Sequence, residues 1–187
     1  SNSSLDNTRH NKVGIEVLGS LSCAMRRSTS VLASLGLRGN SIAAGEGVDL
    51  LAAGIRHSAT VLTELDVSCN PLGNQAAQKL GVAFLEKAAE SASQLCHTHE
   101  ESWKLKMACA GAADTCALAL AKYFRDILLN CCRNQATQHF ELDLYGNPIN
   151  DEGAATLVYA AKDAASISSN LSINLDLGCT NVTNMFV

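Results

Sequence analysis

The stretch FELDLYGNPINDEGAATLVYAAK, residues 140–162, carries two different hydrophobic periods in succession. Its first part alternates apolar and polar residues around Leu142, which is typical of a strand. Its second part spaces Gly153, Leu157 and Ala161 four residues apart, as one face of a helix does. The stretch therefore predicts a strand that turns into a helix within a few residues.

The same pattern occurs three times. The copies are LASLGLRGNSIAAGEGVDLLAAGI from Leu32, LTELDVSCNPLGNQAAQKLGVAFL from Leu62 and HFELDLYGNPINDEGAATLVYAA from His139. Each copy has two apolar strand positions, a turn asparagine, a small residue and two apolar helix positions. The asparagines are Asn40, Asn70 and Asn147, and the small residues are Gly47, Ala76 and Gly153. An asparagine side chain can bond backbone groups where a chain leaves a strand, and a small residue is expected to let the helix start close to the strand layer.

One such unit cannot bury its own apolar face, so the units are expected to stack. Their pattern resembles the leucine-rich repeat in its ribonuclease-inhibitor-like form, LxxLxLxxNxLxxxGxxxLxxxL. The resemblance implies an α/β solenoid with a curved parallel sheet on its concave face and helices on its convex face. Partial copies at both ends bring the total to about four to five full or partial repeats. Residues 1–187 are expected to form a single leucine-rich-repeat domain, a fragment of a longer protein.

The pattern fades between residues 86 and 138. Leu65 and Leu142 are 77 residues apart, whereas Leu35 and Leu65 are 30 apart. One interpretation is a degenerate repeat with Leu105 as its first strand leucine and lengthened helices; the other is a helical insertion. Because a continuous helix from about Glu100 to Arg133 would be far longer than average, we favour a break near Gly111. Either interpretation predicts a helix from Thr115 to Asn130.

The composition is that of a globular chain, with 47% hydrophobic and 17% charged residues, and it favours a core of Leu and Ala because aromatic residues are only 4%. A net charge of −4 argues against a nucleic-acid-binding domain. No apolar run approaches the length of a membrane span, and the N-terminus lacks a signal-peptide core, so we predict a soluble protein without membrane contact. Its cysteine usage predicts a cytoplasmic location. The eight cysteines are expected to be reduced and buried. The sequons at Asn170 and Asn181 are the opposing hint.

Few residues suggest chemistry. Cys96, His97, His99 and Glu100 are the densest ligand-like cluster, but no second ligand pair completes a tetrahedral metal site. Cys131 and Cys132 are adjacent, yet one of them is expected to face the core. The common catalytic signatures are missing as well. We therefore predict no enzyme activity, no cofactor and no metal.

Residues that alternate with the buried strand leucines should line the concave face. The predicted partner-binding positions are Arg38, Glu64, Asp66, Ser68, Lys104, Lys106, Glu141, Asp143, Tyr145 and Asp176. If the degenerate repeat is real, the two lysines fall between acidic pairs, which is a favourable arrangement of charges. Aspartate between the two leucines is also common in this family, so the acidic stripe has an alternative explanation as consensus.

The leading hypothesis is a non-catalytic scaffold that binds another protein, basic or mixed in charge, through the concave sheet and the strand-to-helix loops. The alternative is a regulator of a small GTPase resembling the Ran GTPase-activating proteins, with Arg38 as the conceivable contributor. A metal or redox protein using Cys96 and the histidines is a third reading. Apolar ends of a solenoid cut within repeats also suggest self-association.

Overall fold

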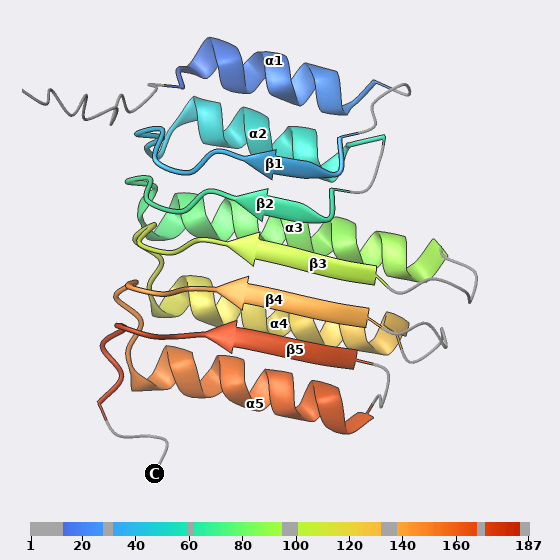
Figure 1. Ribbon diagram of the computed structural model, residues 1–187, viewed down its shortest axis with the longest axis vertical. Helices are drawn as coiled ribbons and strands as arrows, with labels where there is room; N and C mark the ends of the chain where they lie inside the picture. Colours follow the sequence, from blue (N-terminus) through green and yellow to red (C-terminus); the bar gives the residue numbers. More distant parts are fainter. Residues whose placement is uncertain are drawn as a thin grey trace, which may run out of the picture.

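The computed structural model describes residues 13–27, 32–59, 62–94, 101–131, 138–167 and 171–183. Helices and strands alternate along the chain (Figure 1). The helices are α1 (Ile15–Met25), α2 (Glu46–Arg56), α3 (Gly73–Gln94), α4 (Asp114–Cys131) and α5 (Asp151–Ile167). The strands are β1 (Ser34–Gly36), β2 (Glu64–Asp66), β3 (Glu101–Lys106), β4 (Gln138–Asp143) and β5 (Leu171–Asp176). No helix in the described part of the chain is long and apolar enough to cross a membrane.

The strands form one parallel sheet in the order β1-β2-β3-β4-β5, and the helices form a second layer behind it (Figure 1). Leu35, Leu65, Leu105 and Leu142 are in register across four strands, and all are buried. This is the architecture of an α/β solenoid, as the repeat pattern predicted. The exposed face of the sheet, opposite the helices, is called the concave face below.

The segment between residues 86 and 138 contributes a strand and a helix in the order of a repeat. Strand β3 lies between β2 and β4, with Leu105 opposite both Leu65 and Leu142. Gly111 has a φ of +80° in the turn that follows, and α4 spans the helix expected from Thr115 to Asn130. Residues 101–106 are thus a strand in the place that the degenerate-repeat interpretation gives them.

The core departs from the expected layers of Leu and Ala at one place. Phe84, Trp103, Phe124 and Phe140 are buried and pack edge to face, with ring centroids 5.2–6.5 Å apart. Trp103 and Phe140 precede the repeated strand positions of β3 and β4. Phe84 belongs to α3 and Phe124 to α4, so the ring contacts join these two helices to β3 and β4.

The turn asparagines tie neighbouring repeats together. Asn70 Oδ1 accepts hydrogen bonds from the backbone N–H groups of Asn40 and Ile42 in the preceding repeat, and its amide donates to the Leu37 carbonyl. Asn147 binds the repeat that contains β3 in the same way, through Ala110, Ala112 and Met107. The equivalent positions Ala110 and Thr180 carry no asparagine. The turn asparagines, which were predicted to bond nearby backbone groups, thus also bond the backbone of the preceding repeat.

The small residues at the helix starts clear space for the preceding repeat, rather than mainly for the strand layer. A Cβ added at Gly47 would lie 2.8 Å from Leu18 Cδ1, and one at Gly153 would lie 2.5 Å from Asp114 Oδ1. Both contacts are to the helix before, so the expected reason was incomplete. Close stacking of successive helices is what these positions require.

Candidate functional site: the concave face

The concave face carries two rows of side chains that run across the strands. The first row is Ser34, Glu64, Lys104, Glu141 and Asn174, and the second is Gly36, Asp66, Lys106, Asp143 and Asp176. Both rows follow from strand geometry, because every second side chain of a strand points to the same face. The two rows therefore bring together most of the positions that the sequence predicted for partner binding.

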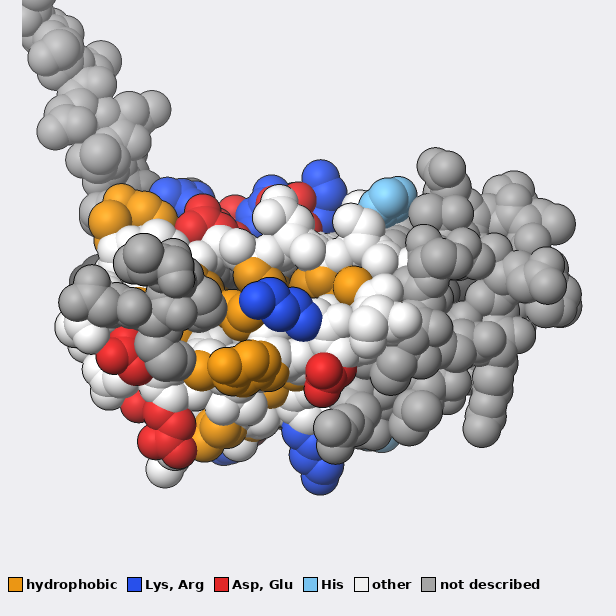
Figure 2. Space-filling model, turned by 90° about the horizontal axis from the view of Figure 1, so that it is seen from below, with side chains coloured by type: hydrophobic (Ala, Val, Ile, Leu, Met, Phe, Trp, Pro, Cys, Tyr) orange, Lys and Arg blue, Asp and Glu red, His pale blue; other side chains and the backbone are white. Residues whose placement is uncertain are grey.

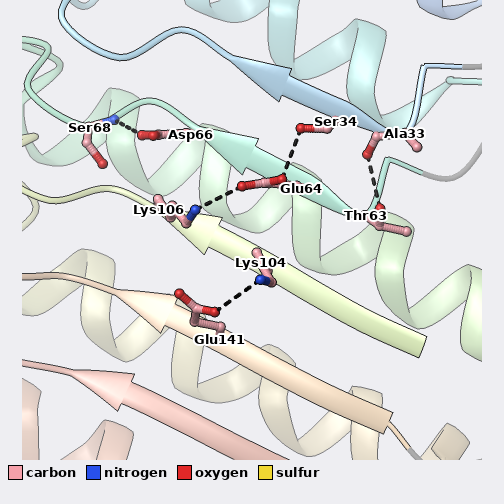
Figure 3. Close-up of polar contacts among 9 residues, drawn as sticks. All are labelled: Ala33, Ser34, Thr63, Glu64, Asp66, Ser68, Lys104, Lys106 and Glu141. Atoms are coloured by element: carbon pink, nitrogen blue, oxygen red, sulfur yellow. Dashed lines mark hydrogen bonds and ion pairs between the residues drawn. The ribbon is translucent and has the colours of Figure 1, made fainter. Parts of the chain in front are cut away.

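The lysines of β3 neutralise the middle of this face (Figure 3). Lys106 Nζ lies 2.9 Å from Glu64 Oε1, and Lys104 Nζ lies 3.7 Å from Glu141 Oε2. Ser34 Oγ also donates to Glu64 Oε2 at 3.1 Å. The hydrogen bond from Lys106, and then that from Ser34, lowers the pKa of Glu64. The hydrogen bond with Glu64 raises the pKa of Lys106. We call Ser34, Glu64, Lys104, Lys106 and Glu141 the paired block.

The aspartates of the second row cap the turns that follow their strands. Their carboxylates accept the backbone N–H two residues on: Asp66 from Ser68, Asp143 from Tyr145 and Asp176 from Gly178, at 2.9–3.0 Å. Such a local bond is the usual role of aspartate at a turn. Their recurrence between the strand leucines therefore has a structural cause that is separate from partner binding.

Ser68 is a correction to the predicted site. It was expected on the concave surface, but its side chain is fully buried. Lys106 replaces the capping aspartate in the repeat that contains β3, so the N–H of Ala108 has no carboxylate acceptor of this kind. Ser68 Oγ accepts that hydrogen bond instead, at 3.1 Å. Ser68 is thus part of the framework between two repeats.

The C-terminal strands carry a second group, Asp143, Tyr145 and Asp176, which we call the acidic–tyrosine patch. Asp143 and Asp176 are opposite each other in the parallel ladder. Within the described part of the chain, neither pairs with a lysine or arginine. Tyr145 is 43% exposed, and its ring lies over Gly178, where an added Cβ would be 2.9 Å from Cδ2. The patch joins an exposed aromatic ring to adjacent carboxylates.

The Tyr145 hydroxyl accepts a hydrogen bond from the Cys179 thiol at 3.0 Å. This bond, followed by the nearby negative charges, raises the pKa of the Tyr145 hydroxyl. Tyr145 therefore stays neutral in the ordinary pH range. It adds an aromatic surface but no charge to the patch.

Arg38 lies just beyond β1, at the opposite end of the sheet from the patch, and its side chain is exposed. In the described residues it forms no ion pair with a carboxylate. The structure therefore does not bring Arg38 together with the C-terminal acidic residues. Among the turn residues, Asn40 is half-exposed and donates to the Arg38 carbonyl.

The expectation that the cysteines are buried is wrong for four of the five whose side chains the structure describes. Cys23, Cys69, Cys109 and Cys179 are exposed, whereas burial raises the pKa of Cys116 to about 12. Three of the exposed thiols follow strands of the sheet at one repeat position, a regularity that the sequence analysis missed. Glycine occupies the same position in two other repeats, as Gly39 and Gly146. Glycine there indicates a left-handed turn, which was the signal in the sequence for this exposed position.

The cluster Cys96, His97, His99 and Glu100 lies outside the described residues, as does Cys132. Elsewhere in the chain that the structure describes, no three His, Cys, Asp or Glu side chains lie close enough to hold a metal ion together. A tetrahedral centre thus has no ligand set in the described parts.

Residues 58–81 and 138–158 match a family model described as a leucine rich repeat. The two stretches contain β2 with the start of α3, and β4 with the start of α5. No curated protein matches the chain. With the alternating parallel strands and helices, the matches show a leucine-rich-repeat solenoid. The ribonuclease-inhibitor-like form stays a prediction.

Proposed function

We propose that this chain is a non-catalytic scaffold that binds a basic segment of another protein through the acidic–tyrosine patch. Leucine-rich-repeat domains commonly mediate protein–protein interaction, which gives the general class. The observation that carries the choice of surface is the difference in charge pairing along the sheet. Lysines form ion pairs with Glu64 and Glu141 in the paired block. Asp143 lies between Lys106 and Asp176 in the ladder, but among the described residues neither aspartate forms an ion pair.

Like charges on neighbouring strands repel each other mildly. A lysine or arginine from a partner would relieve that repulsion at Asp143 and Asp176. The exposed ring of Tyr145 lies beside them and can contact the same cation or its aliphatic stem. Glu64, in contrast, already has its charge satisfied within the chain. We therefore expect partner affinity to depend on β4 and β5 more than on β2 and β3.

An affinity-capture experiment tests the proposal. The immobilised chain should retain proteins that salt releases, because exposed charges are screened over a shorter distance as ionic strength rises. D143N/D176N should lose those proteins while its folding is preserved, since asparagine can still cap each turn. E152Q/D163N, on exposed positions of α5, removes the same charge and should retain them. Equal capture by all three proteins would contradict the proposal.

The regulator of a small GTPase is kept as a second proposal, supported by the exposed guanidinium of Arg38 at the exit of β1. An arginine can stabilise phosphate charge through its guanidinium, and among the described residues Arg38 forms no ion pair that would compete. GTP hydrolysis by candidate GTPases, with the wild type and R38A, would decide this. Unchanged hydrolysis with both would remove Arg38 from consideration.

Self-association is a third proposal and concerns the β5 end of the solenoid. Ile173, Leu175, Leu177 and Val182 are only partly buried against the core. Figure 2, seen from below, shows hydrophobic side chains scattered over this end, with charged side chains among and beside them. Sedimentation of the purified chain with L175K as comparison would test the idea; a monomer at high concentration would contradict it.

A further inference from the structure

One repeat position, directly before the turn asparagine or its replacement, is occupied only by glycine or cysteine. In chain order the residues are Gly39, Cys69, Cys109, Gly146 and Cys179. Their φ angles lie between +51° and +68°, in the left-handed region. Glycine adopts this conformation freely, whereas a cysteine there is strained. The three cysteines are exposed, so core packing does not explain them.

Cys69 and Cys109 are neighbours in space. Asp66 is opposite Lys106 in the parallel ladder, and each cysteine comes three residues later in its repeat. The ladder continues into the turns, because Cys69 N donates to Ala108 O at 2.7 Å. Hydrogen-bonded neighbouring strands are about 4.8 Å apart, so the two Cα atoms are held at about that spacing. Both thiols are free.

This spacing suits a metal ion bound between the two thiols better than a disulfide. Equivalent positions of parallel strands send their Cβ atoms in the same direction, which keeps the two Cβ atoms about 4.8 Å apart, whereas a disulfide needs about 3.5–4.5 Å. Two metal–sulfur bonds of about 2.3 Å, the length found for zinc thiolates, would span about 4.6 Å in a line, close to the strand spacing. A metal ion held between the sulfurs therefore fits better than a direct S–S bond.

We propose that Cys69 and Cys109 form a two-thiolate site for a soft metal ion of low coordination number, of which Cu(I) is the biological example. Thiolates select soft ions. Zinc normally requires four ligands, and no group of three or more His, Cys, Asp and Glu surrounds the pair in the described residues. An ion that needs only two ligands is therefore the kind that this surface accommodates. The site is independent of the proposed partner binding.

Binding changes no oxidation state. Two thiols and one Cu(I) give a bis-thiolate complex of Cu(I) and release two protons, so affinity falls as pH decreases. In the structure the Cys109 sulfur leans toward Gly146, where an added Cβ would lie 2.7 Å from it. Shared binding of a metal ion with Cys69 therefore requires this exposed side chain to rotate about χ1. Cys179 lies on the far side of Gly146 and bonds to Tyr145, so it is not a ligand.

The test replaces each cysteine by glycine, which already occupies this position in two repeats and accepts its φ. The reduced chain is titrated anaerobically with Cu(I) in competition with a chromophoric Cu(I) chelator. Wild type should bind one more equivalent than C69G and than C109G. The matched control C179G should bind as wild type does. Any sites at Cys96 or at Cys131 and Cys132 are present in all four proteins and cancel in the comparison.

Circular dichroism should show the same folded spectrum for all variants, and Cu(I) should raise the melting temperature of wild type and C179G above that of C69G and C109G. Equal Cu(I) binding by all four proteins would overturn the proposal. Loss of the equivalent in C179G, or ready formation of a Cys69–Cys109 disulfide with oxidised glutathione, would overturn the geometry on which it rests.

Discussion

The two halves of the concave face share one framework but differ in their surface. In both halves a buried asparagine ties a repeat to the one before it, Asn70 on the N-terminal side and Asn147 on the C-terminal side. In the paired block, acidic side chains of β2 and β4 meet lysines of β3. In the acidic–tyrosine patch, Asp143 and Asp176 meet each other. The difference comes from one repeat, because β3 alone of these strands carries lysines in both rows.

The two halves help to separate aspartates that the repeat itself requires from aspartates that are candidates for partner binding. A capping aspartate in a repeat is explained by the turn it stabilises, whatever else it does. What distinguishes one capping aspartate from another is the residue beside it on the next strand. Asp66 lies opposite Lys106, whereas Asp143 has Lys106 on one side and Asp176 on the other. Only the arrangement of neighbours therefore singles out the C-terminal edge.

The largest effect is expected from the shared framework. N70A and N147A each remove the acceptor of two backbone N–H groups and the donor to a carbonyl of the preceding repeat, Leu37 or Met107, in a buried turn, so each should lower the free energy of unfolding by about 3 kcal/mol. Urea unfolding checks this. The two losses should agree to within about 1 kcal/mol. A negligible loss in one of them would mean that the halves differ in framework as well.

The next effect distinguishes the cap of Asp143 from its charge. D143A removes the acceptor for the Tyr145 N–H and should cost about 1 kcal/mol of stability. D143N keeps an acceptor and removes the repulsion with Asp176, so it should be neutral or slightly stabilising. Thermal melting of both variants at low salt measures the difference. Equal destabilisation would show that the charge, rather than the cap, holds the turn.

A smaller effect is expected in the paired block. Lys106→Met breaks the contact with Glu64, but both side chains are about one-third exposed, so solvent screening limits the loss to about 0.5 kcal/mol. The loss should shrink further in 1 M salt. A salt-independent loss above about 2 kcal/mol would contradict a screened surface pair and indicate a packing role for Lys106.

The smallest effect is the pH dependence of that same pair. The folded pKa of Glu64 is lowered, so its contribution is present above the unfolded pKa and is lost as pH falls through the folded value. The pKa of Lys106 is raised, so its contribution is present below its unfolded pKa and is lost as pH rises through the folded value. The stability difference between wild type and K106M should be flat near neutrality and vanish in acid. A difference that grows in acid would contradict the pairing.

Much of the framework follows from spacing alone. Leucines at fixed intervals predict which residues of each strand are buried, and the division of the interval from Leu65 to Leu142 predicts a strand around Leu105. The structure has the register that this division requires, with Lys104 and Lys106 beside the acidic residues. Such features depend on periodicity, which a single sequence displays.

Other features depend on contacts between repeats, which spacing does not display. Ser68 is buried because Ala108, forty residues away, needs an acceptor. Trp103 and Phe140 lie outside the repeated motif, so nothing in the pattern predicts that they pack with Phe84. The left-handed turn at Cys69 and Cys109 is likewise set by the backbone path. Each of these requires the three-dimensional neighbour to be known.

The central claim is that recognition uses the acidic–tyrosine patch rather than the paired block. Its most direct test is the dissociation constant of a captured partner, measured for wild type, D143N/D176N and E64Q/K106M, where the second variant removes both charges of one ion pair. The account predicts about tenfold weaker binding for D143N/D176N, or about 1.4 kcal/mol, and a change below about twofold for E64Q/K106M. Weaker binding by E64Q/K106M than by D143N/D176N would contradict it.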